Sequence, residues 1–102
     1  MTRALTEREL EYLGILQEEC AEVIQIISKI RRFGINSWNP FEEYALDNHT
    51  LLMQELGDVM TMIELLQESG LVDPEKIARR IPAKRKKLQE FLNQAVYKDS
   101  KA

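Results

Sequence analysis

Apolar residues recur at helical spacing along the first third of the chain. Thr6 and Glu9 have the spacing of a capping box, in which a hydroxyl and a carboxylate each accept a backbone N–H at the start of a helix. Gly34 is typical of the residue that follows a helix C-terminus. The pattern predicts one helix over residues 7–33, about 40 Å long. Its apolar positions are Leu10, Leu13, Leu16, Cys20, Val23, Ile24, Ile27 and Ile30.

A second apolar stripe predicts a helix over residues 49–69, which Gly70 would end. The stripe comprises Leu51, Leu52, Val59, Met62, Ile63 and Leu66. Asp73 as N-cap and Pro74 at the first helical position predict a third helix, and Pro82 predicts a kink or a restart within it.

Residues 34–48, between the first two helices, are rich in turn-forming residues, and residues 41–46 are the candidate for a short helical turn. The chain carries no strand pattern, so we expect an all-α fold. Two long antiparallel amphipathic helices and a C-terminal basic helix would form a helical bundle. Their wide apolar faces indicate that oligomerisation completes it.

The chain has the length of one domain, 102 residues, of which 44% are hydrophobic and 30% charged. We expect a single helical domain over residues 1–102, with a core of residues 7–96 and a frayed tail at 97–102. There is one cysteine, no apolar run as long as a membrane span, and no apolar signal sequence at the start. These features predict a cytoplasmic protein with no membrane partner.

Two pairs of acids interrupt the apolar stripes. On a helical wheel Glu19 lies within the apolar sector of the first helix, and Glu22 lies at its edge, about 60° away. Glu55 and Asp58 repeat this arrangement on the second helix. Four carboxylates would therefore converge where the helices pack. Ionised together they repel unless cations lie between them, and oxygen-only ligands suit Mg²⁺ first and Mn²⁺ next.

Two alternatives compete with this interpretation. The acids could be boundary residues that reach water or pair with Lys and Arg, but that reading fits one pair better than two matched pairs. A di-iron bundle is expected to carry a Glu-x-x-His motif. The single histidine, His49, does not follow a Glu at that spacing.

The C-terminal quarter of the chain is basic. Residues 1–75 carry 15 acids and 5 bases, whereas residues 76–102 carry 9 bases and 2 acids. Lys84 lies within the apolar sector of the third helix and Lys87 at its edge, so both are candidates to contact anionic oxygens near the acids. The alternative is a solvated face with buried lysine stems. Trp38, in the loop, either stacks on a nucleotide base or fixes the loop to the bundle.

Glu18 and the two acid pairs form the pattern E-E-x-x-E … E-x-x-D. It resembles the signature of the MazG-like all-α nucleoside triphosphate pyrophosphohydrolases. The segments ILQEECAEVIQIISKIRRFG and LLMQELGDVMTMIELL are similar to that family's two core helices, and AKRKKLQEFL is similar to its trailing basic helix. The resemblance covers residues 10–92. The gap between the acid pairs is longer than is common in the family, and NSWNPFEEYALDN fills it, so the family's substrate-contacting loop is not carried over.

The resemblance implies Mg²⁺-dependent cleavage of a nucleoside triphosphate between its α- and β-phosphates, which yields a monophosphate and pyrophosphate. It implies that Glu18 activates or orients the attacking water and that the protein is a homodimer or homotetramer. By the resemblance the metal ligands are Glu19, Glu22, Glu55 and Asp58. The candidate nucleotide contacts are Lys84, Lys87 and Trp38.

Two other functions remain open at the level of sequence. One is a non-catalytic helical interaction module in which the acids hold a structural metal. The other is a nucleic-acid-associated factor that acts through residues 76–87, although the basic run is short and the rest of the chain is acidic. Metal-dependent turnover would distinguish an enzyme from the interaction module. Salt-dependent binding to DNA or RNA would reveal the nucleic-acid-associated factor.

Overall fold

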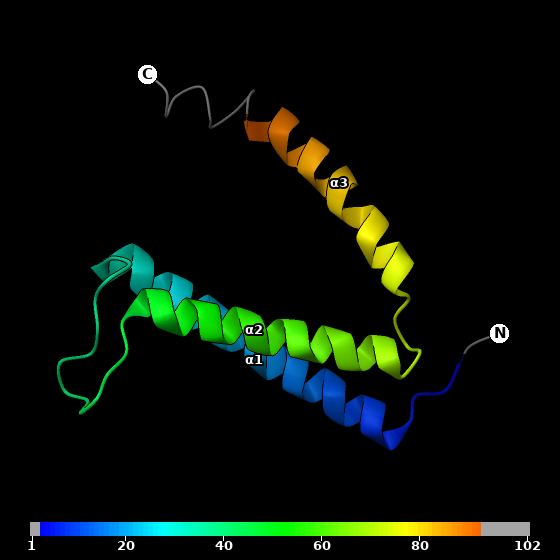
Figure 1. Ribbon diagram of the computed structural model, residues 1–102, viewed down its shortest axis with the longest axis horizontal. Coiled ribbons are helices and arrows are strands. Elements are labelled where there is room, and N and C mark those ends of the chain that lie inside the picture. The colour runs from blue at the N-terminus through cyan, green and yellow to red at the C-terminus, as the bar shows by residue number, and fades with distance from the viewer. Residues whose placement is uncertain (1–2, 93–102) are drawn as a thin grey trace. The chain divides into compact units, whose positions relative to one another are not determined.

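A computed structural model describes residues 3–92 of the chain. This part contains three α-helices, α1 (Glu7–Phe33), α2 (Asn48–Glu68) and α3 (Pro74–Phe91), and no strand (Figure 1). The all-α prediction is confirmed, and both long helices begin and end within one residue of their predicted bounds. The predicted tail at 97–102 lies outside the described residues.

The helices belong to two compact units that divide between residues 71 and 72. The first unit contains α1 and α2, and the second contains α3. The single domain over residues 1–102 stays a prediction, and each unit is described separately below.

The predicted capping box starts α1. The Thr6 hydroxyl accepts a hydrogen bond from the Glu9 backbone N–H at 3.0 Å, and Glu9 Oε1 accepts one from the Thr6 N–H at 3.0 Å. Gly34 ends the helix at φ 99°, in the left-handed region that glycine adopts without a side-chain clash. Its N–H donates to the Ile30 carbonyl at 2.8 Å. Local sequence rules therefore set both ends of α1.

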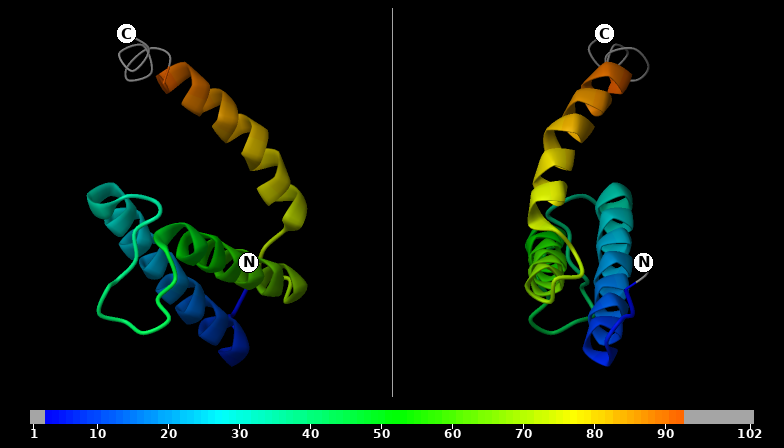
Figure 2. Two further views of the ribbon diagram at one scale, coloured as in Figure 1. Left: turned by 60° about the vertical axis from the view of Figure 1, so that its left-hand side comes forward. Right: turned by 90° about the vertical axis from the view of Figure 1, so that its right-hand side faces the viewer.

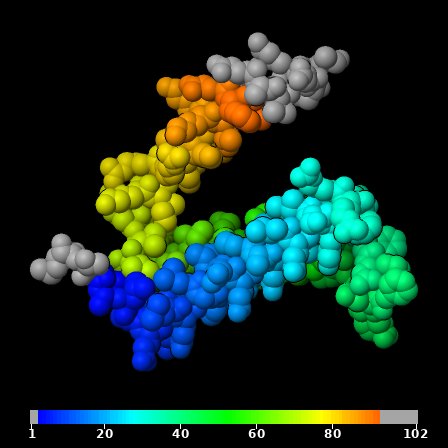
Figure 3. Space-filling model, turned by 180° about the vertical axis from the view of Figure 1, so that it is seen from behind, coloured from blue at the N-terminus to red at the C-terminus, as the bar shows by residue number. Residues whose placement is uncertain are grey.

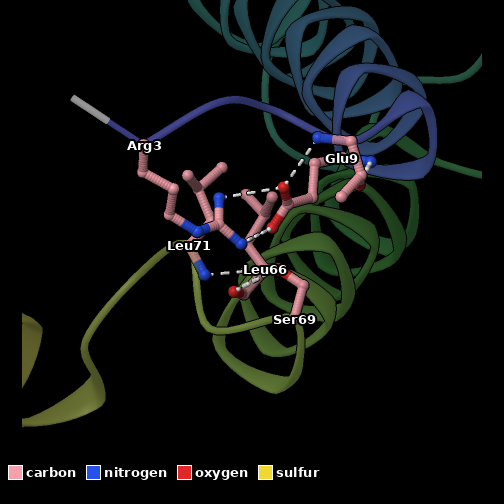
Figure 4. A network of polar contacts seen from close by, with 6 residues as sticks. Arg3, Glu9, Leu66, Ser69 and Leu71 are labelled. Carbon is pink, nitrogen blue, oxygen red and sulfur yellow. Dashed lines mark hydrogen bonds and ion pairs between the residues drawn. The ribbon is translucent and has the colours of Figure 1, made fainter.

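Glu9 is also the centre of a buried polar contact near the end of α2 (Figure 4). Its side chain is almost completely buried and accepts two hydrogen bonds from Arg3, at 2.9 and 2.7 Å. Beside it, Ser69 donates to the Leu66 carbonyl at 2.9 Å. The Arg3 guanidinium, and then the Thr6 N–H, lower the pKa of Glu9 to about 2. The segment that precedes α1 is thus fixed by an ion pair.

Helices α1 and α2 lie side by side and antiparallel (Figures 1 and 2). Ile26, Met62 and Leu66 form the fully buried apolar core of this pair. Buried Asn48 joins the helices at the loop end, where its Nδ2 donates to the Gly34 carbonyl at 3.0 Å. The core is small because two helices can cover only one face of each other.

The loop of residues 34–47 projects from the end of the helix pair (Figure 3). Its base is held by backbone hydrogen bonds, from Asn48 N–H to the Ser37 carbonyl and from His49 N–H to the Ile35 carbonyl, both 2.8 Å. Residues 41–46 contain turns and no helix, so the short helical turn that these residues could have formed is absent. Instead Asn39 Oδ1 accepts the Phe41 N–H at 3.0 Å, which stabilises a turn.

Large apolar side chains of α1 and α2 remain exposed outside the shared core. Among them are six with exposed fractions from 43% to 68%: Leu10, Ile24, Ile27, Met53, Leu56 and Met60. The first unit therefore presents more apolar surface than its own two helices cover.

Helix α3 begins as predicted, with the Asp73 carboxylate accepting the Glu75 N–H at 2.9 Å and Pro74 in the first turn. The helix continues through Pro82, so the predicted restart does not occur. The described residues after Ile77 are all exposed within this unit. None of the three helices has a stretch both long and apolar enough to cross a membrane.

Candidate functional site: an acid cluster beside a loop pocket

The structure brings carboxylates from α1 and α2 together midway along the helix pair. Glu19, Glu55 and Asp58 each place one carboxylate oxygen within 4.8 Å of the others. Glu19 and Glu55 are half-buried, and Asp58 is exposed. We call these three residues the acid cluster. It forms because each helix carries an acid inside its apolar stripe and the two stripes face each other.

Two oxygens of the acid cluster, Glu19 Oε2 and Glu55 Oε2, are buried and have no hydrogen-bond partner among residues 3–92. Buried carboxylate oxygens normally accept hydrogen bonds, because losing water without compensation costs free energy. A proton or a cation held between the Glu19 and Glu55 carboxylates would compensate for this loss.

The pKa values of the pair reflect this environment. Burial, followed by the neighbouring carboxylates of Glu22 and Glu19, raises the pKa of Glu55 to about 7. The neighbouring Glu55 carboxyl group lowers the pKa of Glu19, but burial and the charges of Glu22 and Asp58 outweigh it, so this pKa is also raised. In the absence of a cation, the two carboxyls compete for one proton.

Glu22 and Glu18 lie on the same stretch of α1, and both are exposed. Glu22 is close enough for its charge to raise the pKa of Glu55, although it is outside the group of three oxygens. Both acids of the predicted pair on α2, Glu55 and Asp58, therefore belong to the acid cluster. Of the pair on α1, Glu19 belongs to the cluster and Glu22 lies at its edge. Glu18 immediately precedes Glu19 in α1.

The acid cluster fits a hard divalent cation. Its donors are all carboxylate oxygens, the type that Mg²⁺ and Mn²⁺ prefer. A cation would also satisfy Glu19 Oε2 and Glu55 Oε2, for which the described residues offer no donor. The residues available to hold it are Glu19, Glu55 and Asp58, with Glu22 at the edge.

The predicted nucleotide contacts are distributed over both units. Lys84 and Lys87 lie on α3 and are exposed within the second unit. Their approach to the acid cluster stays a prediction. Trp38 lies in the loop of the first unit, and 62% of its surface is exposed.

An open pocket of about 410 Å³ lies between the loop, the end of α1 and the start of α2. The sequence reasoning named Trp38 but missed the pocket and most of its other residues. Aromatic side chains at Trp38 and Phe41, three positions apart in a turn-rich segment, were the available signal. The lining residues are Lys29, Phe33, Ser37, Trp38, Asn39, Pro40, Phe41, Glu42, Leu46, Asn48 and Leu51.

Comparison with known proteins gives no match to a protein-family model, a curated protein or a solved structure. The resemblance to the MazG-like pyrophosphohydrolases therefore rests on the acid motifs and helical segments of the chain itself.

Proposed function

We propose that the protein is a Mg²⁺-dependent nucleotide pyrophosphohydrolase. Its substrate would be a ribo- or deoxyribonucleoside triphosphate, cleaved between the α- and β-phosphates to a monophosphate and pyrophosphate. The assignment combines the E-E-x-x-E … E-x-x-D pattern with the position of its acids on two adjacent helices.

The observation that carries the proposal is the pair of unpartnered buried oxygens, Glu19 Oε2 and Glu55 Oε2. Acids that only solubilise a surface would point to water or to a basic side chain. Glu19, Glu55 and Asp58 instead each place a carboxylate oxygen within 4.8 Å of the others. Repulsion in such a group makes cation binding favourable, and an all-oxygen site favours Mg²⁺, with Mn²⁺ as a substitute.

Hydrolysis of the α–β anhydride adds one water molecule across a P–O bond and releases one proton. Glu18, exposed beside Glu19, would accept that proton and orient the water. Glu19, Glu22, Glu55 and Asp58 would hold the metal close to the phosphates. The bound metal would supply charge neutralisation on phosphate oxygens and a lowered pKa for the attacking water.

The exposed apolar rows of α1 and α2 support the oligomeric part of the proposal. Side chains such as Ile24 and Met60, 68% and 63% exposed, would be covered by a second copy of the chain in a homodimer or homotetramer. In that assembly α3 would complete a helical bundle with the two long helices. Lys84 and Lys87 would then add positive charge beside the phosphates, in a cytoplasmic enzyme.

The same acid cluster also supports a second function, a non-catalytic interaction module stabilised by a structural metal. The exposed apolar rows would then bind a protein partner. The two functions differ in turnover, because both predict stabilisation by Mg²⁺ but only the enzyme releases pyrophosphate.

The test is a substrate panel. The purified protein is incubated with each of the common NTPs and dNTPs at saturating Mg²⁺, and pyrophosphate and monophosphate are quantified. The proposal predicts stoichiometric release of both products from at least one substrate. If Mg²⁺ stabilises the protein but no nucleotide yields pyrophosphate, the enzyme proposal is rejected and the interaction module is retained.

A further inference from the structure

We propose that the pocket beside the acid cluster is the subsite for the nucleotide base, with Trp38 as the surface on which the base stacks. The inference rests on the proposed function, because it places the phosphates at the acid cluster. It adds that the site selects nucleotides over phosphoanhydrides that have no base, such as tripolyphosphate.

The base of the loop is held by contacts that do not involve the Trp38 side chain. The loop base is already held by the two backbone hydrogen bonds that Ser37 and Ile35 accept from the start of α2. Trp38 is 62% exposed, although it lines the pocket. Of the two interpretations open at the level of sequence, an anchor for the loop and a stacking surface, this geometry favours the stacking surface.

The pocket contains three aromatic rings from two elements. Phe33 ends α1, and Trp38 and Phe41 belong to the loop. All three are largely exposed, and Phe41 reaches 94%. Exposed aromatic side chains that line a pocket are typical of sites that bind planar rings by stacking. The volume of about 410 Å³ falls in the range of small-ligand sites.

The pocket also lies at the right place relative to the acid cluster. On α2, Leu51 of the pocket is one turn before Glu55, about 6 Å along the axis. On α1, Lys29 of the pocket is two turns after Glu22, the acid at the edge of the cluster, about 10 Å along the axis. These spacings place Leu51 on the face of α2 that carries Glu55, and Lys29 on the face of α1 that carries Glu22. A nucleoside can span such a separation, with its base in the pocket and its phosphates at the acids.

The polar side chains of the pocket fit the same ligand. Lys29 lies one turn closer to the acid cluster along α1 than Phe33, and it brings a positive charge to the pocket lining. At the loop, Asn39 Nδ2 donates to Glu42 Oε1 at 3.3 Å. This pair offers an amide and a carboxylate to the edge of a base. Aromatic faces, one cation and hydrogen-bonding groups together match a nucleotide rather than an apolar ligand.

Trp38 is the single tryptophan of the chain, so its fluorescence reports on the pocket directly. We would titrate the protein with nucleoside monophosphates in EDTA, where no metal and no turnover contribute, and repeat the titration in Glu55→Gln. Phe41→Ala tests the pocket. Tyr44→Ala is the matched control, because Tyr44 is an equally exposed aromatic residue of the same loop that does not line the pocket.

The expected result is a saturable change in Trp38 fluorescence that persists in Glu55→Gln and in Tyr44→Ala. Phe41→Ala should weaken binding about tenfold, the loss typical of one stacking contact. Because the readout needs neither metal nor hydrolysis, base binding without pyrophosphate release would reject the proposed function and retain this subsite.

Four results would overturn the inference. They are no saturable change with any monophosphate, the same change with tripolyphosphate, equal weakening by Tyr44→Ala and Phe41→Ala, or a change that follows protein concentration alone. The last would assign the pocket to contact with a second copy of the chain.

Discussion

Glu19 and Glu55 face each other from two antiparallel helices, and each buries one carboxylate oxygen that has no hydrogen-bond donor in the described part of the chain. The contact joins residues that are 36 positions apart in the sequence. It places two groups of like charge in the one interface that the first unit can bury. This arrangement is unfavourable in the metal-free chain, and the first prediction follows from that cost.

Replacing Glu55 by Gln should stabilise the metal-free protein. At pH 8 Glu55 is ionised, since its pKa is about 7. Gln removes that charge, and its amide can donate to the unpartnered oxygen of Glu19. We expect a gain of about 1–3 kcal/mol in the free energy of unfolding, measured by urea denaturation in EDTA. Glu64→Gln, an exposed acid on α2, is the control and should change little. Lower stability for Glu55→Gln than for this control would show that the pair is not under repulsion.

Mg²⁺ or Mn²⁺ should stabilise the wild-type protein and leave Glu55→Gln nearly unaffected. A ligand that binds only the folded state adds about 2.7 kcal/mol at a hundred times its dissociation constant. Differential scanning fluorimetry across a metal titration measures this shift in Tm. Equal shifts in the wild type, Glu19→Gln and Glu55→Gln would place the metal elsewhere on the chain.

Arg3→Ala should lower Tm more than Arg8→Ala. Arg3 donates two hydrogen bonds to a buried carboxylate, so its removal leaves the charge of Glu9 without its partner. Arg8 pairs with Glu11 at 3.6 Å, with about 70% of both side chains exposed, and such pairs contribute little. Thermal unfolding of the two variants decides the point. A Tm for Arg3→Ala that matches Arg8→Ala would mean that the Arg3–Glu9 contact has no energetic role.

The Arg3–Glu9 pair should also make stability depend on pH in the acidic range. The pKa of Glu9 is lowered from its usual 4.5 to about 2. Between about pH 4.5 and pH 2 the Glu9 carboxylate is therefore ionised in the folded state, whereas the unfolded chain binds a proton there. The stabilisation is complete above about pH 4.5 and is lost as the pH falls towards 2. The free energies of unfolding of the wild type and Glu9→Gln should converge as the pH falls through this window. A difference that stays constant across the window would contradict the assignment.

The helices were predictable because their signals are local. Thr6, Gly34 and Asp73 act on residues within one turn, and the position of Glu19 in an apolar stripe follows from helical periodicity alone. The facing of Glu19 and Glu55 required only that both stripes point to a common core. These are the parts of the fold and of the site that the sequence predicts.

The loop pocket and the Arg3–Glu9 pair depend on contacts between distant segments. Asn48 reaches back to Gly34, and His49 to Ile35. These hydrogen bonds shape a loop for which the sequence indicated only turn-forming residues and a candidate helical turn. Arg3 precedes the first helix, so no periodicity indicated that its side chain would cover Glu9. Such geometry emerges only when the chain has folded.

The most direct measurement of the central claim compares pyrophosphate release by wild-type protein, Glu55→Gln and Glu64→Gln at saturating Mg²⁺. Circular dichroism verifies that all three are folded. The account predicts release by the wild type and Glu64→Gln, and a loss of about a hundredfold or more in Glu55→Gln, since the metal ligand is removed. Wild-type activity in Glu55→Gln, or no release by folded wild-type protein with bound Mg²⁺, would contradict it.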